Sequence, residues 1–182
     1  MLIYKAVLLW EFGMILSFLI LVVFAATMLT AALKDASTMT IPNWVSVVVL
    51  VAFFLTMPFV WQGFPHFGEH LLVGTFMFLL GFGMFAMGWL GGGDAKLMAA
   101  TSFWWTWPDL LMYGVYTTIA GGALALFILV GRKFVPVRVM TMPWMHRMFK
   151  DEKKMPYGLA LAFGALVTLP QSEIFKYAAS LG

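Results

Sequence analysis

The chain has 182 residues, of which 63% are hydrophobic and only 10% are charged. A soluble domain of this size could not cover so much apolar surface with polar groups, so the composition indicates an integral membrane protein. The net charge of +3 is typical of membrane proteins with basic cytoplasmic loops, and we expect no nucleic-acid partner. The absence of cysteine excludes disulfides, thiol nucleophiles and cysteine-ligated metals.

The first apolar run covers residues 12–33 and carries no charge. As a helix it extends roughly 33 Å, which matches the hydrocarbon core of a bilayer. It is longer than the apolar part of a signal peptide and follows an acidic residue, so we interpret it as a retained membrane span. The further apolar runs cover residues 45–60, 71–90, 97–107, 110–130 and 157–169, the last with an amphipathic tail to 181.

These runs lack the alternation of barrel strands, and lipid offers backbone groups no partner outside a helix. The sequence therefore predicts an all-α membrane protein, with residues 1–182 forming a single polytopic helical bundle of about six transmembrane helices, within a range of roughly four to seven. The polar segment 132–154 interrupts the pattern. We expect a cytoplasmic loop at residues 132–156 that lies on anionic headgroups.

The distribution of basic residues predicts the orientation. If the first helix runs from outside to inside, only Lys5 and Lys176 of the eleven basic residues face the outside, which leaves nine on the cytoplasmic side. The positive-inside rule therefore favours an N-terminus and a C-terminus outside the cytoplasm. The same arrangement places Asp35 and Asp94 on the cytoplasmic side.

Histidine and tryptophan residues suggest positions at the membrane surface. His66 and His70 could share a helix face, but their aromatic and glycine-rich surroundings favour a wet interfacial position over a metal site. We expect neither a metal nor a cofactor. Trp104, Trp105 and Trp107 stand beside a proline, and we interpret them as an outer aromatic belt.

Two aspartates at the ends of apolar runs are the candidates for chemistry. Asp35 follows the first run, and Asp94 follows three glycines between two apolar runs. Each alone could be a boundary charge, and Asp94 could be a helix N-cap. Two carboxyl groups held close together share one proton, so the pair could activate water and protonate a departing group, as in amide hydrolysis.

Three motifs resemble those of the type IV prepilin peptidases. Segment 91–97, GGGDAKL, resembles the family's GxGD motif with its following lysine. Segment 35–43, DASTMTIPN, is similar to the second signature, an aspartate six residues before Ile-Pro-Asn. Segment 155–166, MPYGLALAFGAL, resembles the Pro-aromatic-Gly motif that opens the family's last helix. A lone GxGD is weak, whereas three motifs in the family's order, each at a helix boundary, are specific.

The resemblance implies an aspartic membrane endopeptidase in which Asp35 and Asp94 are the catalytic residues. Its expected substrates are prepilins or pseudopilins, cut at the cytoplasmic face of the bacterial inner membrane between a basic leader and an apolar helix. The small size of the chain resembles the CpaA/TadV branch, which serves Flp-type tight-adherence pili. The absence of a cysteine-containing insertion implies peptidase activity without N-methylation.

The same motifs nominate supporting residues: Gly91, Gly93 and Lys96 around one aspartate, Ile41, Pro42 and Asn43 after the other, and Pro156, Tyr157 and Gly158 at the last helix. Pro42 should start the second helix, with Asn43 satisfying free backbone groups. Lys96 either reaches the interface, which we favour, or stabilises the charge of Asp94. Tyr157 either hydrogen-bonds a dyad carboxylate or anchors the chain at the interface.

A second interpretation is a non-enzymatic membrane transport or assembly protein in which Asp35 and Asp94 bind protons or ions. The sequence shows no internal repeat, and the Ile-Pro-Asn and Pro-Tyr-Gly motifs would need a separate explanation. A third interpretation is a peptidase-like fold without catalysis, which the two intact aspartates argue against. The expected partners are prepilins and membrane lipids, and the sequence predicts no oligomeric state.

Overall fold

The computed structural model describes residues 2–134 and 155–180, and this part of the chain is built from helices and short connections. In chain order the elements are α1 (Leu2–Thr38), α2 (Asn43–Thr56), α3 (Phe64–Ala86), α4 (Gly92–Ser102), α5 (Trp107–Phe134), α7 (Tyr157–Thr168), the short 3-10 helix η2 (Leu169–Gln171) and α8 (Glu173–Ser180). The loop expected at 132–156 lies mostly outside the described residues, since α5 continues to Phe134.

Four stretches of the described chain are long and apolar enough to cross a membrane: Phe18–Thr38 of α1, Phe64–Ala86, Trp107–Phe134, and Tyr157–Ser180, which joins α7 to α8. The apolar α2 and the central α4 have 14 and 11 residues and extend only roughly 21 and 17 Å. The prediction of an all-α membrane bundle is confirmed. The number of six spans and the orientation of the termini stay predictions.

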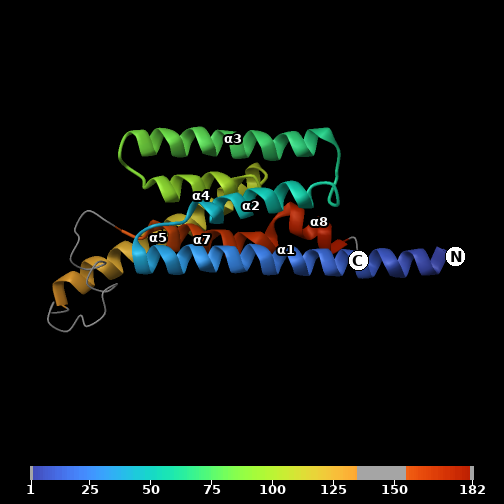
Figure 1. Ribbon diagram of the computed structural model, residues 1–182, viewed down its shortest axis with the longest axis horizontal. Coiled ribbons are helices and arrows are strands. Elements are labelled where there is room, and N and C mark those ends of the chain that lie inside the picture. Colours follow the sequence, from blue (N-terminus) through green and yellow to red (C-terminus); the bar gives the residue numbers. More distant parts are fainter. Residues whose placement is uncertain (1, 135–154, 181–182) are drawn as a thin grey trace.

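The helices lie in layers around α4 (Figure 1). Helix α3 packs on α4 from one side, α2 lies beside α4, and α7 lies on the opposite side together with α1 and α5. Because α4 contacts α2, α3 and α7, nearly every residue from Ala95 to Ser102 is buried, with the exposed Lys96 as the clear exception. A polar residue in the first turn of α4 therefore faces protein rather than lipid.

The core of the bundle is aromatic. Trp104 and Trp105, in the connection between α4 and α5, are buried against Phe24 of α1 with ring centroids 5.2 and 6.0 Å apart. The Trp104 indole N–H donates a hydrogen bond of 3.1 Å to the Val49 carbonyl of α2. The prediction of an outer aromatic belt is therefore wrong for these two residues. For Trp107, which is exposed, it stays a prediction.

Helices α5 and α7 approach each other closely through glycines. A Cβ atom at Gly121 would lie 2.9 Å from the Tyr157 ring, and a Cβ atom at Gly164 would overlap the Thr117 hydroxyl. Small residues let neighbouring membrane helices bring their backbones together, which increases van der Waals contact. This packing holds the start of α7, and with it the segment that follows Pro156, against the middle of α5.

Candidate active site

Asp35 lies in the last turn of α1, where it is only 4% exposed. The helix ends directly after it because Met39 adopts a positive φ of 54°, and the chain then turns towards α2. One carboxylate oxygen, Oδ2, accepts a hydrogen bond of 2.7 Å from the backbone N–H of Gly158. The carboxyl group at the end of the first helix therefore contacts the start of α7, 123 residues later in the chain.

Asp94 lies in the first turn of α4. The connection from α3 turns at Gly88, whose φ is +73°, and reaches an extended conformation at Gly91. The Asp94 side chain folds back over Gly91, where a Cβ atom would lie 2.8 Å from Oδ2. Within the described chain, the other oxygen, Oδ1, is buried and has no hydrogen-bond partner. The carboxyl group thus keeps an unsatisfied acceptor that points into protein.

Glycines bring the two aspartates together. The Gly158 amide binds Asp35, and the two aspartates line the same cavities. A Cβ atom at Gly158 would lie 2.8 Å from Asp35 Oδ2 and 2.7 Å from Ile41 Cδ1. Here Gly91, Gly93 and Gly158 serve close approach, whereas positive φ occurs at Gly88.

The Ile-Pro-Asn motif lies beside this site, where the loop after α1 ends and α2 begins. Ile41 is buried, and a Cβ atom at Gly93 would lie 3.1 Å from it. Pro42 occupies the N-cap position of α2, so the second helix begins where the proline predicts. The prediction that Asn43 satisfies backbone groups differs from the structure, because its side-chain oxygen accepts a hydrogen bond of 3.0 Å from the exposed Lys96.

Pro156 and Tyr157 begin the helix that carries Gly158. Pro156 takes the N-cap position of α7, and Tyr157 is its first residue, so the motif starts a helix as expected. The Tyr157 ring packs against Gly121 of α5, and the residue lines the same cavity as both aspartates. The structure thus adds a packing contact with α5 to the two alternatives proposed for Tyr157, which were a hydrogen bond to a carboxylate and an interfacial anchor.

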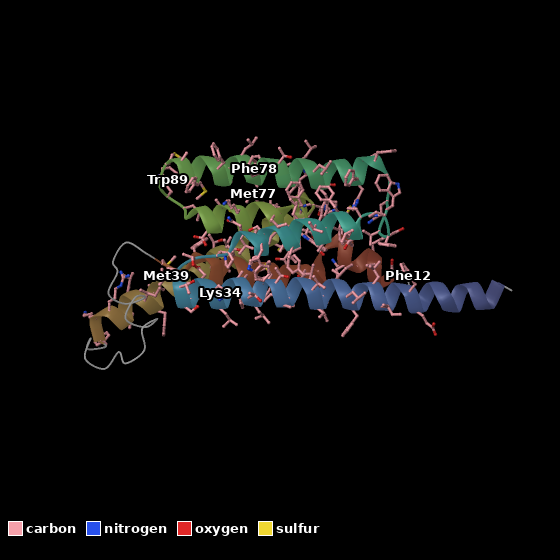
Figure 2. The ribbon with its side chains drawn as sticks, viewed as in Figure 1. Phe12, Lys34, Met39, Met77, Phe78 and Trp89 are labelled. Atoms are coloured by element: carbon pink, nitrogen blue, oxygen red, sulfur yellow. The ribbon has the colours of Figure 1, made fainter. Side chains whose placement is uncertain are left out.

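A cavity of about 850 Å³ opens next to the aspartates. Its lining combines residues from every helix except α2 and α8: Asp35, Met39, Met77, Met84, Gly88, Trp89, Leu90, Gly91, Asp94, Met98, Leu110, Tyr113, Gly114, Thr117, Thr118, Met155, Tyr157 and Leu161. A second cavity of about 270 Å³ reaches both carboxyl groups from the side of residues 39–41 and 91–93. In Figure 2, Met39 and Trp89 lie at one end of the bundle and Phe12 lies towards the other.

Comparison with known families gives one match. The model of the type IV leader peptidase family matches residues 22–126, which are 105 of the 182 residues. The matched region contains both aspartates, the Ile-Pro-Asn motif and the glycines before Asp94. The chain belongs to the type IV leader peptidase family. No curated protein and no solved structure matches the chain.

The sequence of this leader peptidase did not reveal which apolar residues surround the site. Five methionines line the larger cavity. Tyr113 was not singled out, although its buried hydroxyl lies 3.3 Å from the Thr101 hydroxyl and its ring packs against Trp105. A single tyrosine in an apolar run carries no sequence signal, because only the contact between α4 and α5 turns it towards the cavity.

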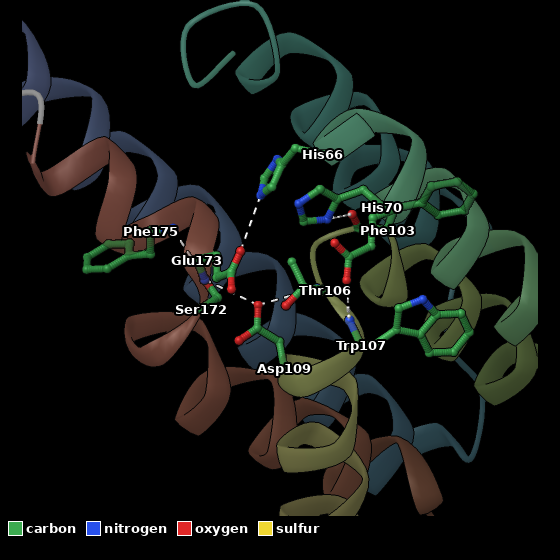
Figure 3. A network of polar contacts seen from close by, with 10 residues as sticks. His66, His70, Phe103, Thr106, Trp107, Asp109, Ser172, Glu173 and Phe175 are labelled. Carbon is green, nitrogen blue, oxygen red and sulfur yellow. Dashed lines mark hydrogen bonds and ion pairs between the residues drawn. The ribbon is translucent and has the colours of Figure 1, made fainter. Parts of the chain in front are cut away.

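Figure 3 shows a polar network that includes His66, Asp109 and Glu173. In Figure 1 the starts of α3 and α8 lie at the end of the bundle away from the turn between α1 and α2. The network joins α3, the connection between α4 and α5, and α8. The Asp109 carboxylate accepts backbone N–H groups of Thr106 and Glu173 at 3.3 and 3.2 Å, and His66 Nε2 lies 3.4 Å from Glu173 Oε2. The network ties the starts of α3, α5 and α8 together and includes neither Asp35 nor Asp94.

The expectation of wet, interfacial histidines is wrong for His70. This side chain is fully buried in α3, and its Nδ1–H donates to the Phe103 carbonyl at 3.0 Å. Its ring stacks edge-on against His66 with centroids 4.7 Å apart. Within residues 2–134 and 155–180, no group of three or more histidine, aspartate or glutamate side chains could hold a metal ion. The His70 hydrogen bond connects α3 to the segment between α4 and α5.

Removing the Asp109 carboxylate should lower stability while leaving cleavage intact. In Asp109→Ala, two backbone N–H groups lose their acceptor, at a cost of about 1–3 kcal/mol. For a chain of this size each kcal/mol lowers the thermal midpoint by about 2–4 °C. Thermal unfolding in detergent, followed by intrinsic fluorescence, measures the shift. An unchanged midpoint would contradict the role of this network.

The hydrogen bond from Lys96 to Asn43 should have only a small effect on the rate of cleavage. The pair is exposed, and exposed polar pairs are worth about 0–1 kcal/mol. We expect Lys96→Met and Asn43→Ala each to slow cleavage by less than about tenfold, and the double variant to be no slower than the worse single variant. Rates of substrate cleavage in membranes measure the effect. Additive losses would show that the two residues act separately.

Proposed function

We propose that Asp35 and Asp94 form the catalytic dyad of an aspartic endopeptidase. One observation supports this most directly: Asp35 of α1 and Asp94 of α4 line the same two cavities. Burying two acidic groups side by side is costly in a membrane domain, so such pairs are retained for function. The family assignment supports a leader peptidase, and the dyad supplies its chemistry.

In the proposed mechanism the two carboxyl groups share one proton, because two adjacent buried carboxylates cannot both carry a charge. The ionised carboxylate takes a proton from water as the water oxygen attacks the scissile carbonyl carbon. The protonated carboxyl group gives its proton to the carbonyl oxygen. The tetrahedral intermediate then collapses and the carbon–nitrogen bond breaks. The amine leaves with the proton taken from water, and a hydroxyl of the intermediate returns its proton to the other carboxylate, which gives the carboxylic acid product and restores the singly protonated pair.

The contacts of Asp35 and Asp94 suggest a different catalytic role for each carboxyl group. The Gly158 N–H donates to Asp35 Oδ2 and so fixes the orientation of that carboxyl group, and we assign Asp35 as the base. Asp94 Oδ1 has no partner in the described chain, which suits Asp94 as the carboxyl group that holds the shared proton, and the residue lines the cavity that would receive the substrate. The smaller cavity, which reaches both groups from residues 39–41, offers water a route that the substrate does not occupy.

The proposed substrates are prepilins or pseudopilins of the Flp type, with a basic leader before an apolar helix. The site lies where α1 ends and α4 and α7 begin, at the same end of the bundle as Lys34 and the basic end of α5. By the positive-inside rule this end faces the cytoplasm, where a basic leader would remain. We propose that the peptidase acts at the inner membrane without N-methylation, as in the CpaA/TadV branch.

Cleavage of a co-expressed Flp-type prepilin tests the proposed function. We expect the wild-type chain to shorten the prepilin, as followed by gel shift, and mass spectrometry of the new N-terminus to locate the cut between the leader and the apolar helix. A matched strain without the chain is the control. A proton or ion flux that requires both aspartates, with no shortened prepilin, would overturn the proposal in favour of a transport protein.

A further inference from the structure

The larger cavity extends well beyond the aspartates into an apolar part. Met77 and Met84 of α3, Met98 of α4, and Leu110 and Gly114 of α5 line this part. Methionine side chains are flexible and polarisable, so they adapt to different apolar surfaces. Hydrolysis of one peptide bond at the dyad does not need an apolar chamber of this kind. Its lining instead fits a segment that is itself apolar.

The apolar part opens between the α3–α4 connection and α5. Gly88 and Trp89 on one rim, and Gly114 and Thr118 on the other, line the cavity and are exposed. Neighbouring residues on α5 belong to the lipid-facing surface, since Leu111 is 72% exposed and apolar. The opening therefore lies on the side of the bundle that faces the bilayer, not only at its cytoplasmic end.

The dimensions suit the end of a helix. A helix about 10 Å wide rises about 5.4 Å per turn and so fills roughly 400 Å³ per turn. The cavity of about 850 Å³ has room for such a turn beside an extended segment at the dyad. Helices α3 and α5 lie on different sides of α4 and contact each other near Phe76 and Trp107, so the proposed entry lies beside that contact.

At Gly114, no side chain projects from α5 into the opening of the cavity. Among the described residues, no heavy atom lies within 4 Å of the position that a Cβ atom at Gly114 would take. The Thr118 hydroxyl donates back to the Gly114 carbonyl, so the rim presents no unsatisfied hydroxyl donor. Small residues of this kind let two helices approach closely in lipid. A second glycine of α5, Gly122, is equally open but does not line the cavity.

We propose that the first turns of the substrate's apolar helix dock in this cavity, entering sideways from the bilayer between α3 and α5 and lying against Gly114. This inference rests on the proposed peptidase function and adds a binding surface to it. The docked helix places the residues that precede it, in extended form, at Asp35 and Asp94. The surface thus selects substrates that carry an apolar helix directly after the scissile bond.

Leucine substitutions at the two open glycines of α5 test the surface. Gly114→Leu fills the rim and should slow cleavage of the co-expressed prepilin by at least about tenfold, the cost of overpacking a contact. Gly122→Leu, the matched control, should stay within about twofold of wild type, because it changes only exposed surface. Leucine favours helix more than glycine does, so neither change should prevent folding. Equal rates for the two variants would overturn the proposal.

Cross-linking provides a readout that does not depend on the rate. Because the chain has no cysteine, Gly114→Cys and Gly122→Cys each introduce a single thiol. In an Asp94→Asn background, oxidation with a prepilin that carries one cysteine in the first turns of its apolar helix should link to Gly114→Cys and not to Gly122→Cys. Absence of the Gly114→Cys adduct would overturn the docking surface, whereas failure of the wild-type chain to cut the prepilin would overturn the proposed function.

Discussion

Asp35→Asn and Asp94→Asn should each abolish cleavage of the prepilin, with a loss of at least about a thousandfold. Each change preserves side-chain size but removes a group that must exchange a proton with water or with the scissile carbonyl, and such groups are worth about 10²–10⁴ individually. Because the two carboxyl groups act as one unit, the double variant should be no slower than either single variant. Initial rates in membranes with equal amounts of enzyme measure the effect.

The matched control for this experiment is Asp109→Asn. Asp109 is also a buried aspartate, 8% exposed, but it belongs to the polar network at the other end of the bundle. We expect this variant to retain cleavage within about threefold, since it changes stability and not the reacting groups. If the Asp35 and Asp94 variants cut as fast as the control, the two aspartates would be structural and the proposed mechanism wrong.

Gly158→Ala should have the second largest effect, a loss of about a hundredfold in cleavage rate, because displacing a reacting group by about 1 Å costs this much. The added Cβ atom would lie 2.8 Å from Asp35 Oδ2 and 2.7 Å from Ile41 Cδ1. Relief of this overlap requires a shift of the carboxylate or of the α7 start, which would weaken the 2.7 Å hydrogen bond from the Gly158 N–H. Cleavage rate and thermal midpoint should be measured on the same preparation.

Gly68→Ala in α3 is the control for Gly158→Ala. Within the described chain, no heavy atom lies within 4 Å of a Cβ atom at Gly68, so this change adds a methyl group without overlap. Its rate should stay within about twofold of wild type. If Gly158→Ala also retained its rate at an unchanged thermal midpoint, the close approach of α7 to Asp35 would have no part in catalysis.

Local sequence patterns predict much of this protein because they act over a few residues. Composition and uninterrupted apolar runs indicate membrane helices, since lipid leaves the backbone no other way to satisfy its hydrogen bonds. Pro42 predicts the start of α2, and Pro156 predicts the start of α7. The spacing of Asp35 and Asp94 from their motifs nominates the candidate dyad without any knowledge of distances.

Other features depend on contacts between distant segments, which local patterns do not encode. Trp104 in an aromatic cluster and His70 in a glycine-rich segment both suggest a membrane interface, yet tertiary packing buries both. Helix α4 is short for a span, and its position among α2, α3 and α7 explains how a helix of 11 residues remains inside the bundle. Its contacts with these three helices keep α4 inside the bundle, although the helix is too short to span the bilayer.

By itself, the sequence determined the all-α membrane class and the family motifs and nominated two acidic groups as a candidate dyad, because each follows from residue type and short-range spacing. Only the tertiary structure decided that Gly158, 123 residues after Asp35, donates its N–H to that carboxylate, and that methionines of α3 and α4 share a cavity with Gly114 of α5. These relations arise from glycine-mediated close packing of helices, whose partners and rotations depend on the whole bundle rather than on any one segment.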